Sequence, residues 1–161
     1  MDVTKKVPVR EQAPDVRNKN FDEVCLGYNE EEAVLEASRC INCKNAQCIK
    51  GCPVSINIPA FIHEVKEKNF EAAYKIIGQS SALPAVCGRV CPQESQCEGK
   101  CIRGIKGEAI SIGKLERFVA DWARQNQIKP EKSTEKKNKK VAVTTSARRK
   151  ARLQLRSSRP T

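Results

Sequence analysis

Two groups of cysteines are the residues of this chain best suited to chemistry. The 161-residue sequence has nine cysteines, and eight follow the patterns Cys-x2-Cys-x4-Cys-x3-Cys-Pro over residues 40–53 and Cys-x3-Cys-Pro-x4-Cys-x3-Cys over residues 87–101. Three thiolates on one tight loop can hold three corners of a cubane iron–sulfur cluster, but a fourth from the same loop would have to wrap around the inorganic core. One such loop therefore predicts a second, and the pair of loops predicts two iron–sulfur clusters.

Eight thiolates suffice for two cubane clusters, so the spacing alone leaves Cys25 without a metal. We expect Cys25, which precedes the first predicted helix, to be a small buried apolar residue. On this count every cysteine of the two loops is a candidate ligand, namely Cys40, Cys43, Cys48, Cys52, Cys87, Cys91, Cys97 and Cys101.

Disulfide bonds and zinc are the competing chemistries for these cysteines. The N-terminus lacks the apolar stretch of a secretory signal and the number of cysteines is odd, so a secreted disulfide scaffold is disfavoured. Zinc sites usually pair their ligands at two-residue spacing, which only Cys40 and Cys43 have. A zinc-binding interaction module stays the alternative to an iron–sulfur protein.

One carboxylate complicates the count of eight thiolates. A helix is predicted from Ser111 to about Gln127, with Leu115, Val119 and Trp122 on its apolar side. At about 100° per residue, Glu116 falls on the same apolar arc. A carboxylate that faces a core must be paired or bound to a metal. Periodicity alone favours equally a metal ligand and a residue at the rim of the arc that reaches solvent.

The elements that position these residues are predicted to be helices, so the fold class is all-α, with cluster loops between the helices. Residues 1–28 are interrupted by two prolines and predict an extended N-terminal arm. The helical two-cluster domain spans 29–128. Its helices begin at Asn29 as an N-cap, at Pro59 as a first-turn proline and at Asn69 as a second N-cap, with Gly78 ending the third.

Three side chains of these helices carry further expectations. Phe118 and Trp122 are expected to anchor the core against the cluster loops. His63 lies off the apolar stripe of its helix and is expected to be a solvated surface residue rather than a metal ligand.

The positive charge of the chain is concentrated after the predicted domain. Residues 129–161 contain 12 Lys and Arg and two Glu, whereas the first 128 residues contain 18 basic and 17 acidic residues. A segment so basic and so poor in apolar side chains is typical of a disordered linker or tail. The basicity is therefore no property of the folded part, which argues against specific nucleic-acid binding. No apolar run approaches the ~20 residues of a membrane span, and we expect a cytoplasmic protein.

Three long motifs resemble one known module. They are residues 40–53, residues 83–101 and residues 112–122. The module is the N-terminal iron–sulfur domain of the small, NADPH-oxidising subunit of glutamate synthase, which is shared with dihydropyrimidine dehydrogenase and with NADH-dependent ferredoxin–NADP reductases. The resemblance covers about residues 5–143. It implies a helical domain with two [4Fe–4S] clusters that passes electrons between a flavin/NADPH module and a large glutamate synthase-type subunit.

The resemblance also implies how the ligands are shared between the two loops. One cluster would be held by Cys40, Cys43, Cys48 and Cys101, and the other by Cys52, Cys91, Cys97 and Glu116. In this arrangement Cys87 is not a ligand, and the adjoining loop formed by Gly88, Arg89 and Val90 approaches the flavin. Lys100, Arg103 and Lys106 near the second loop are equally explained as charges that offset the reduced clusters and as ordinary surface charges.

The resemblance ends where a flavin-binding domain would begin. Residues 139–143 match the first strand of that domain, but no glycine follows up to residue 161, so the glycine-rich turn that cradles pyrophosphate cannot form. We expect this chain to lack the FAD and NADPH domains and not to oxidise NADPH alone. Residues 144–161 are interpreted either as a shifted reading frame or as a basic tail with its own role. The sequence leaves open whether the parent enzyme makes glutamate or serves ferredoxin.

Overall fold

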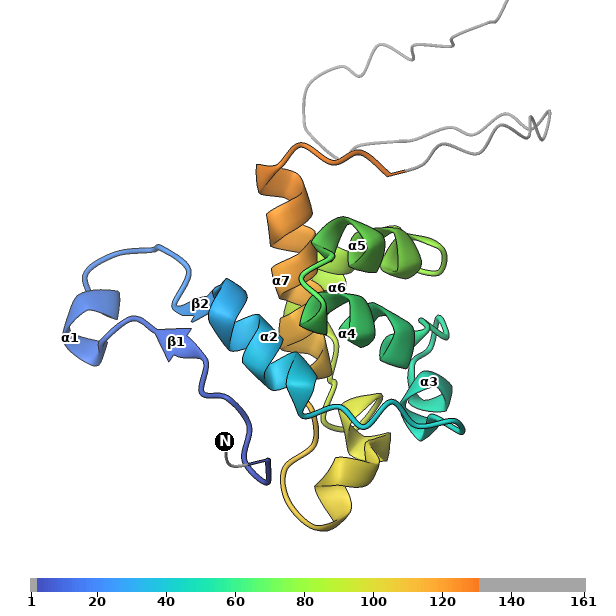
Figure 1. Ribbon diagram of the computed structural model, residues 1–161. Coiled ribbons are helices and arrows are strands. Elements are labelled where there is room, and N and C mark those ends of the chain that lie inside the picture. The colour runs from blue at the N-terminus through green and yellow to red at the C-terminus, as the bar shows by residue number, and fades with distance from the viewer. Residues whose placement is uncertain (1–2, 131–161) are drawn as a thin grey trace, which may run out of the picture. The chain divides into compact units, whose positions relative to one another are not determined.

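The computed structural model describes residues 3–130, which form a helix-rich domain (Figure 1). The predictions for residues 139–143 and 144–161 lie outside this part of the chain. The elements in chain order are β1 (Arg10–Glu11), α1 (Pro14–Arg17), β2 (Cys25–Gly27), α2 (Glu30–Ser38), α3 (Gln47–Gly51), α4 (Ile58–Lys66), α5 (Phe70–Gly78), α6 (Pro84–Val90), the 3-10 helices η1 (Glu98–Lys100) and η2 (Ile102–Ile105), and α7 (Ile112–Gln125).

Helix α2 starts where its sequence requires. The side chain of Asn29 accepts a hydrogen bond from the Glu32 N–H at 2.8 Å, and the Glu32 carboxylate accepts one from the Asn29 N–H at 2.8 Å. This capping box satisfies two backbone donors that a helix start leaves free. The prediction of a helix after Asn29 is confirmed, and the last turn of the helix delivers the chain to the first cysteine loop.

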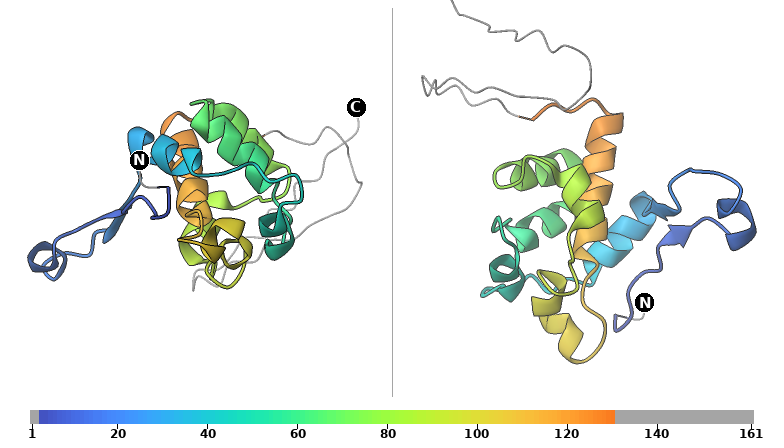
Figure 2. Two further views of the ribbon diagram at one scale, coloured as in Figure 1. Left: turned by 60° about the horizontal axis from the view of Figure 1, so that its bottom comes forward. Right: turned by 180° about the vertical axis from the view of Figure 1, so that it is seen from behind.

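Helix α7 is the central element of the core and packs against α2, α4, α5 and α6 (Figures 1 and 2). Leu115 and Val119 of α7 and Phe61 and Val65 of α4 are fully buried. Phe118 and Trp122 anchor the core as predicted, but the ring that they contact is Phe70 of α5, with centroids 5.1 and 5.5 Å away. These two rings therefore fix α5 on α7.

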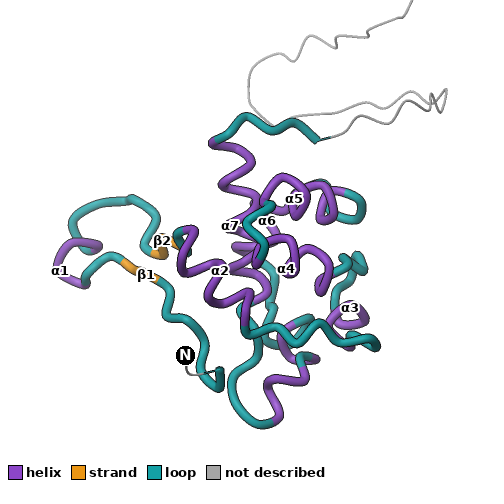
Figure 3. The backbone as a smooth tube through the Cα atoms, viewed as in Figure 1, coloured by secondary structure: helices purple, strands orange, loops and turns teal. Residues whose placement is uncertain are grey.

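The N-terminal arm is more structured than its prolines suggested. Strands β1 and β2 pair antiparallel, with Arg10 opposite Gly27, and α1 begins at Pro14 between them (Figure 3). The all-α assignment is thus corrected to a helix-rich fold with one small two-stranded sheet. The pairing partners are far apart in the sequence and each strand is only two or three residues long, so neither shows a periodicity of its own.

The segments between the long helices also contain short helices. Helix α3 lies within the first cysteine loop, α6 overlaps the start of the second, η1 lies within the second and η2 just after it. The predicted cluster loops between the helices thus contain helical turns of their own, and most of their cysteines lie in or next to a helix, whereas Cys43 does not. None of the helices within residues 3–130 has the length and apolarity needed to span a membrane.

Candidate metal centres

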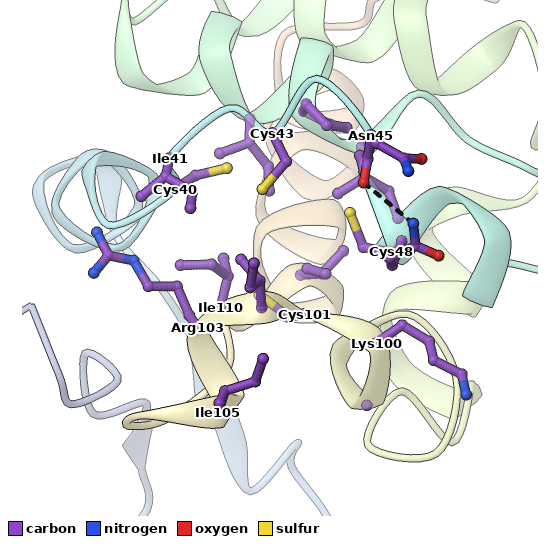
Figure 4. A pocket seen from close by; sticks show the side chains of 18 residues that line it. Cys40, Ile41, Cys43, Asn45, Cys48, Lys100, Cys101, Arg103, Ile105 and Ile110 are labelled. Atoms are coloured by element: carbon purple, nitrogen blue, oxygen red, sulfur yellow. Dashed lines mark hydrogen bonds between the residues drawn. The ribbon is translucent and has the colours of Figure 1, made fainter.

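Four cysteines from both loops line one cavity. Cys40, Cys43 and Cys48 of the first loop and Cys101 of the second surround a space of about 330 Å³. Figure 4 shows the sulfur atoms of the three first-loop cysteines turned toward a shared space beside Cys101. The apolar wall of the cavity comes from α4, from the first residue of α7 and from the segment before α7, namely Ile58, Pro59, Ile62, Ile110 and Ile112. The structure thus brings together the first ligand set that the family resemblance implies.

Local backbone features shape the first loop around this cavity. Asn42 adopts a left-handed conformation with φ of 49°, which asparagine tolerates better than most residues. Its backbone N–H hydrogen-bonds to the thiol of Cys40 and lowers the pKa of that thiol, against the larger effect of burial. Cys48 lies in the first turn of α3. The left-handed residue Asn42 and the first turn of α3 therefore direct Cys40 and Cys48 into the same cavity.

The two loops are in close contact at Gly51. A Cβ atom at Gly51 would lie 2.6 Å from the carbonyl oxygen of Gln96 and 2.9 Å from the side chain of Lys100. Only glycine allows the end of α3 to pack this tightly on the segment that leads into η1. This contact positions Cys101 opposite the first loop.

Burial dominates the electrostatics of the thiols at the cavity. It raises the pKa of Cys48 to about 11, and the neighbouring charge of Cys101 adds to the rise. Burial also raises the pKa of Cys40, again with a contribution from Cys101. These thiols are therefore protonated at neutral pH in the metal-free chain, and a bound metal must displace their protons.

A second group of candidate ligands, Cys52, Cys91, Cys97 and Glu116, is linked by electrostatic effects on the pKa values of Cys91 and Cys97. Burial is the largest cause of the raised pKa of Cys91, and the charges of Cys87, Glu116 and Cys52 raise it further. The pKa of Cys97 rises to about 12 for the same first reason, with contributions from Glu98, Cys52 and Glu116. Cys52 from the first loop is thus electrostatically close to Cys91 and Cys97 of the second, as the implied second ligand set requires.

Glu116 is buried rather than placed at a solvent-exposed rim. Its residue is 8% exposed, and Oε1 has no hydrogen-bond partner among residues 3–130. Burial alone raises the pKa of Glu116 to about 7. A buried carboxylate oxygen without a donor is costly unless a cation binds it. This orphaned oxygen belongs to a carboxylate whose charge also raises the pKa of Cys91 and Cys97, and it fits a role as a metal ligand.

The two cysteines outside the implied ligand sets have other partners. Cys87 lies near Cys91, and its Sγ accepts a hydrogen bond from the Ser81 hydroxyl at 3.9 Å. Cys25 in β2 is half-buried, and its Sγ accepts a hydrogen bond from Lys114 Nζ at 3.9 Å. Cys25 was expected to be a small buried apolar residue, and this is corrected: it is only partly buried and has a polar partner.

Gly88, Arg89 and Val90, expected near a flavin, occupy three different environments in α6. Gly88 is buried against α7. The Arg89 guanidinium binds the carboxylates of Glu23 and Asp121 at 2.8 Å each, and its hydrogen bond lowers the pKa of Glu23. Val90 is 70% exposed. Arg89 and Val90 thus both lie at the surface, but the Arg89 guanidinium is held by two carboxylates.

One charged contact beside the cysteines was not predicted. Glu98, between Cys97 and Cys101 in the sequence, is buried, and its carboxylate accepts hydrogen bonds from Lys6 Nζ at 2.6 Å and the Gly113 N–H at 3.2 Å. In the sequence, only the position of Glu98 between two cysteines indicates that it lies close to the second loop. The contact fastens the arm and the start of α7 to the second loop.

His63 is exposed on α4, in agreement with the prediction of a surface residue.

The ligands of a zinc ion lie about 2.0–2.3 Å from the metal. Within residues 3–130, no three His, Cys, Asp or Glu side chains converge as the ligands of one metal ion would. The four thiols of the first set instead surround the cavity described above.

Comparison with known proteins gives a consistent family match. Residues 17–128 match the family described as dihydropyrimidine dehydrogenase domain II, 4Fe-4S cluster. The chain is 38% identical over 133 residues to the putative oxidoreductase AegA of Escherichia coli K12, a match that covers 81% of this chain and 20% of AegA. It is 36% identical to the glutamate synthase [NADPH] small chain of the same strain, over 80% of this chain and 27% of that protein.

A third relative is a subunit of a dehydrogenase. The chain is 37% identical to the NAD-dependent dihydropyrimidine dehydrogenase subunit PreT of Escherichia coli K12, over 76% of this chain and 30% of PreT. The chain thus spans between a fifth and a third of the length of these curated relatives.

Proposed function

Because the chain belongs to the dihydropyrimidine dehydrogenase domain II, 4Fe-4S cluster family, we propose that it is the electron-transfer module of an oxidoreductase and binds two [4Fe–4S] clusters. Each such cluster supplies a site that takes up and releases one electron at a time. The single observation that carries the proposal is the cavity lined by four thiols from both loops. The protein's part is to hold, separate and shield the two sites.

The ligands of the first proposed site are Cys40, Cys43, Cys48 and Cys101. The isoleucines of α4 and α7 that wall this cavity keep water from its inner side. A wall of this kind lowers the local polarity, which is one of the factors that set the reduction potential of a cluster.

The ligands of the second proposed site are Cys52, Cys91, Cys97 and Glu116. The electrostatic proximity of Cys52 and Glu116 to the two second-loop cysteines supports this set. The orphaned Glu116 Oε1 supports it independently. Cys52 and Cys101 each serve the site of the opposite loop, so the contact of α3 with the second loop at Gly51 fixes the separation of the two sites.

The proposed electron donor is a flavin/NADPH module, and the proposed acceptor is a large glutamate synthase-type subunit. The glutamate synthase small chains among the relatives support this assignment. The second candidate for the parent is an NADH-dependent ferredoxin–NADP reductase. FAD and NADPH belong to the complete enzyme in either case, and we do not expect residues 3–130 to bind them.

Anaerobic purification tests the proposal. We expect a brown protein with about eight iron atoms and eight acid-labile sulfides per chain, whose visible absorbance bleaches on addition of dithionite. Stoichiometric zinc without iron or sulfide would identify the zinc-binding interaction module instead.

A further inference from the structure

We propose that the ion pair between Lys6 of the N-terminal arm and Glu98 of η1 raises the reduction potential of the second proposed cluster above the value that it would have beside Glu98 alone. This inference rests on the proposed function, because it assigns an electrostatic role to two residues beside the second ligand set. Lys6 and Glu98 are positioning residues in this role: they act on the site through their charges and do not bind the metal.

Glu98 places a buried negative charge between the two ligand sets. It directly follows Cys97, which belongs to the second set, and precedes Cys101 of the first set by three residues. The Glu98 side chain is only 8% exposed. Water therefore screens its charge weakly, and the charge acts more strongly on its neighbours than one at the surface would.

The thiol of Cys97 responds to the Glu98 charge. Burial is the largest cause of the raised pKa of Cys97, about 12, and the charge of Glu98 is the next. Ionisation of this thiol adds a negative charge beside Glu98. Reduction of a cluster adds one electron, and therefore also a negative charge, without breaking a bond. A carboxylate that opposes the first change opposes the second, so Glu98 without a counter-charge would lower the reduction potential of the second site.

Lys6 supplies the counter-charge from 92 residues away in the sequence. Its Nζ lies 2.6 Å from Glu98 Oε2, and Glu98 Oε1 accepts a hydrogen bond from the Gly113 N–H at 3.2 Å. Each carboxylate oxygen thus has a donor, but of the two donors only Lys6 carries a positive charge. Lys6 therefore offsets the effect of Glu98 on the second site.

Backbone contacts of the arm hold Lys6 beside Glu98. The Lys6 N–H donates to the Glu108 carboxylate at 2.6 Å, and the Glu108 N–H donates to the Thr4 carbonyl oxygen at 2.8 Å. A Cβ atom at Gly107 would lie 2.6 Å from the same Thr4 oxygen, so the arm and the segment after η2 are in close contact. The arm is therefore part of the electrostatic surroundings of the second site, although it contains none of the proposed ligands.

The signs of two shifts separate charge control from a contact that only fastens the arm. Lys6→Gln leaves the Glu98 charge without its cation and should lower the potential of the second cluster. Glu98→Gln keeps the shape of the side chain and an acceptor for the Gly113 N–H, but it removes the negative charge and should raise that potential. Loss of a purely structural contact would move the potential in the same direction in both variants.

Redox titration of the full chain purified without oxygen, followed by visible absorbance and electron paramagnetic resonance, measures both potentials. We expect each variant to change the one-electron reduction equilibrium of the second cluster about tenfold, or about 59 mV, in opposite directions. The double variant Lys6→Gln/Glu98→Gln should return close to the wild-type potential. Cys97→Ser, which removes a proposed ligand of the second site, identifies the transition of that site.

The matched controls are Lys5→Gln and Glu94→Gln, which make the same charge changes at exposed residues. They should change the equilibrium by less than about twofold, because water and salt screen exposed charges. Shifts of the same sign in Lys6→Gln and Glu98→Gln, no shift in either, or shifts no larger than in the controls overturn this inference, while about eight iron atoms in the wild type leave the cluster proposal standing.

Iron content of the two variants completes the test. Loss of iron from Lys6→Gln or Glu98→Gln would mean that the pair serves to hold the fold together, and it also overturns the inference. A wild-type chain without iron overturns the cluster proposal, and this inference with it.

Discussion

Glu116 combines burial, an unsatisfied oxygen and a raised pKa. The side chain faces the core from α7, where its neighbours Leu115 and Val119 are fully buried. Its pKa is raised by burial alone, to about 7, so no nearby charge offsets the cost of ionising it. Such a residue lowers the stability of the metal-free fold unless it serves another purpose. Metal ligation, as proposed above, would be such a purpose.

The pH dependence of stability tests this burial. Below pH 4.5 Glu116 is protonated in both the folded and the unfolded metal-free chain, so its ionisation does not lower the free energy of unfolding. Between pH 4.5 and about 7 only the unfolded chain ionises, which favours unfolding by up to about 3 kcal/mol at the upper end. We expect Glu116→Gln to gain about that stability over wild type between pH 4.5 and 7.5 in urea denaturation. The control Glu67→Gln, at an exposed position, should leave the free energy of unfolding unchanged. If the free energies of unfolding of the wild type and Glu116→Gln change in parallel with pH, the raised pKa of Glu116 is contradicted.

Helix α6 shows how closely an element must pack to place the second loop. A Cβ atom at Gly88 would lie 2.7 Å from the backbone nitrogen and 2.8 Å from the Cα atom of Arg117 in α7. Backbone atoms cannot rotate away as a side chain can, so the two helices would have to separate. Cys87 and Cys91 flank this contact, and Glu116 precedes its partner. The contact between Gly88 and Arg117 therefore sets the distance between the second loop and α7.

The glycine contact makes a direct prediction. Gly88→Ala should destabilise the domain by about 1–3 kcal/mol, the usual cost of overpacking, and should reduce iron retention by the second site. Gly78→Ala is the matched control, because a Cβ at Gly78 meets nothing within 4 Å. That variant should be neutral or slightly more stable in thermal unfolding. Equal melting temperatures for the two variants would show that α6 adjusts without cost.

The long elements were predictable and the short ones were not. Asn29, Pro59 and Asn69 mark the starts of α2, α4 and α5, because caps and first-turn prolines act locally. Helix α3 has five residues and η1 has three, so each is too short to show an apolar stripe. Their helical turns therefore leave no periodic signal.

The candidate site was predictable in its ligand types but not in its surroundings. Spacing identified the cysteines as candidate ligands, and periodicity favoured equally a metal ligand and a solvent-exposed rim position for Glu116; its burial excludes the rim position. Contacts between distant residues, such as Lys6 with Glu98 and Arg89 with Glu23, depend on how the arm folds back. No local pattern specifies such contacts.

Across the whole molecule, one buried ion pair fastens the arm, α2 and α7 together. Arg39 Nη1 donates to Glu36 Oε1 at 2.6 Å, and both side chains are almost completely buried. Glu36 also accepts hydrogen bonds from the backbone N–H groups of Val7 and Ser111, both at 2.8 Å. Arg39 further donates to the carbonyl oxygen of Glu108. Since Cys40 follows Arg39 directly, this pair also fixes the start of the first loop.

Breaking that pair should have a global effect. Arg39→Met leaves the Glu36 carboxylate buried without its cation, so we expect a loss of about 3–5 kcal/mol in the free energy of unfolding. Lys75→Met removes the cation of the exposed Glu71–Lys75 pair and should cost about 0.5 kcal/mol or less. Chemical denaturation monitored by circular dichroism measures both. A loss in Arg39→Met no larger than in Lys75→Met would mean that the arm and α7 are held by other contacts.

Iron content in two double variants tests the exchange of ligands between the loops most directly. If Cys40 and Cys101 serve one cluster while Cys52 serves the other, Cys40→Ser/Cys101→Ser damages a single site and should retain about four iron atoms per chain, whereas Cys40→Ser/Cys52→Ser damages both and should retain almost none. The reverse result, almost no iron in the first variant and about four atoms in the second, would show that each loop binds its own cluster.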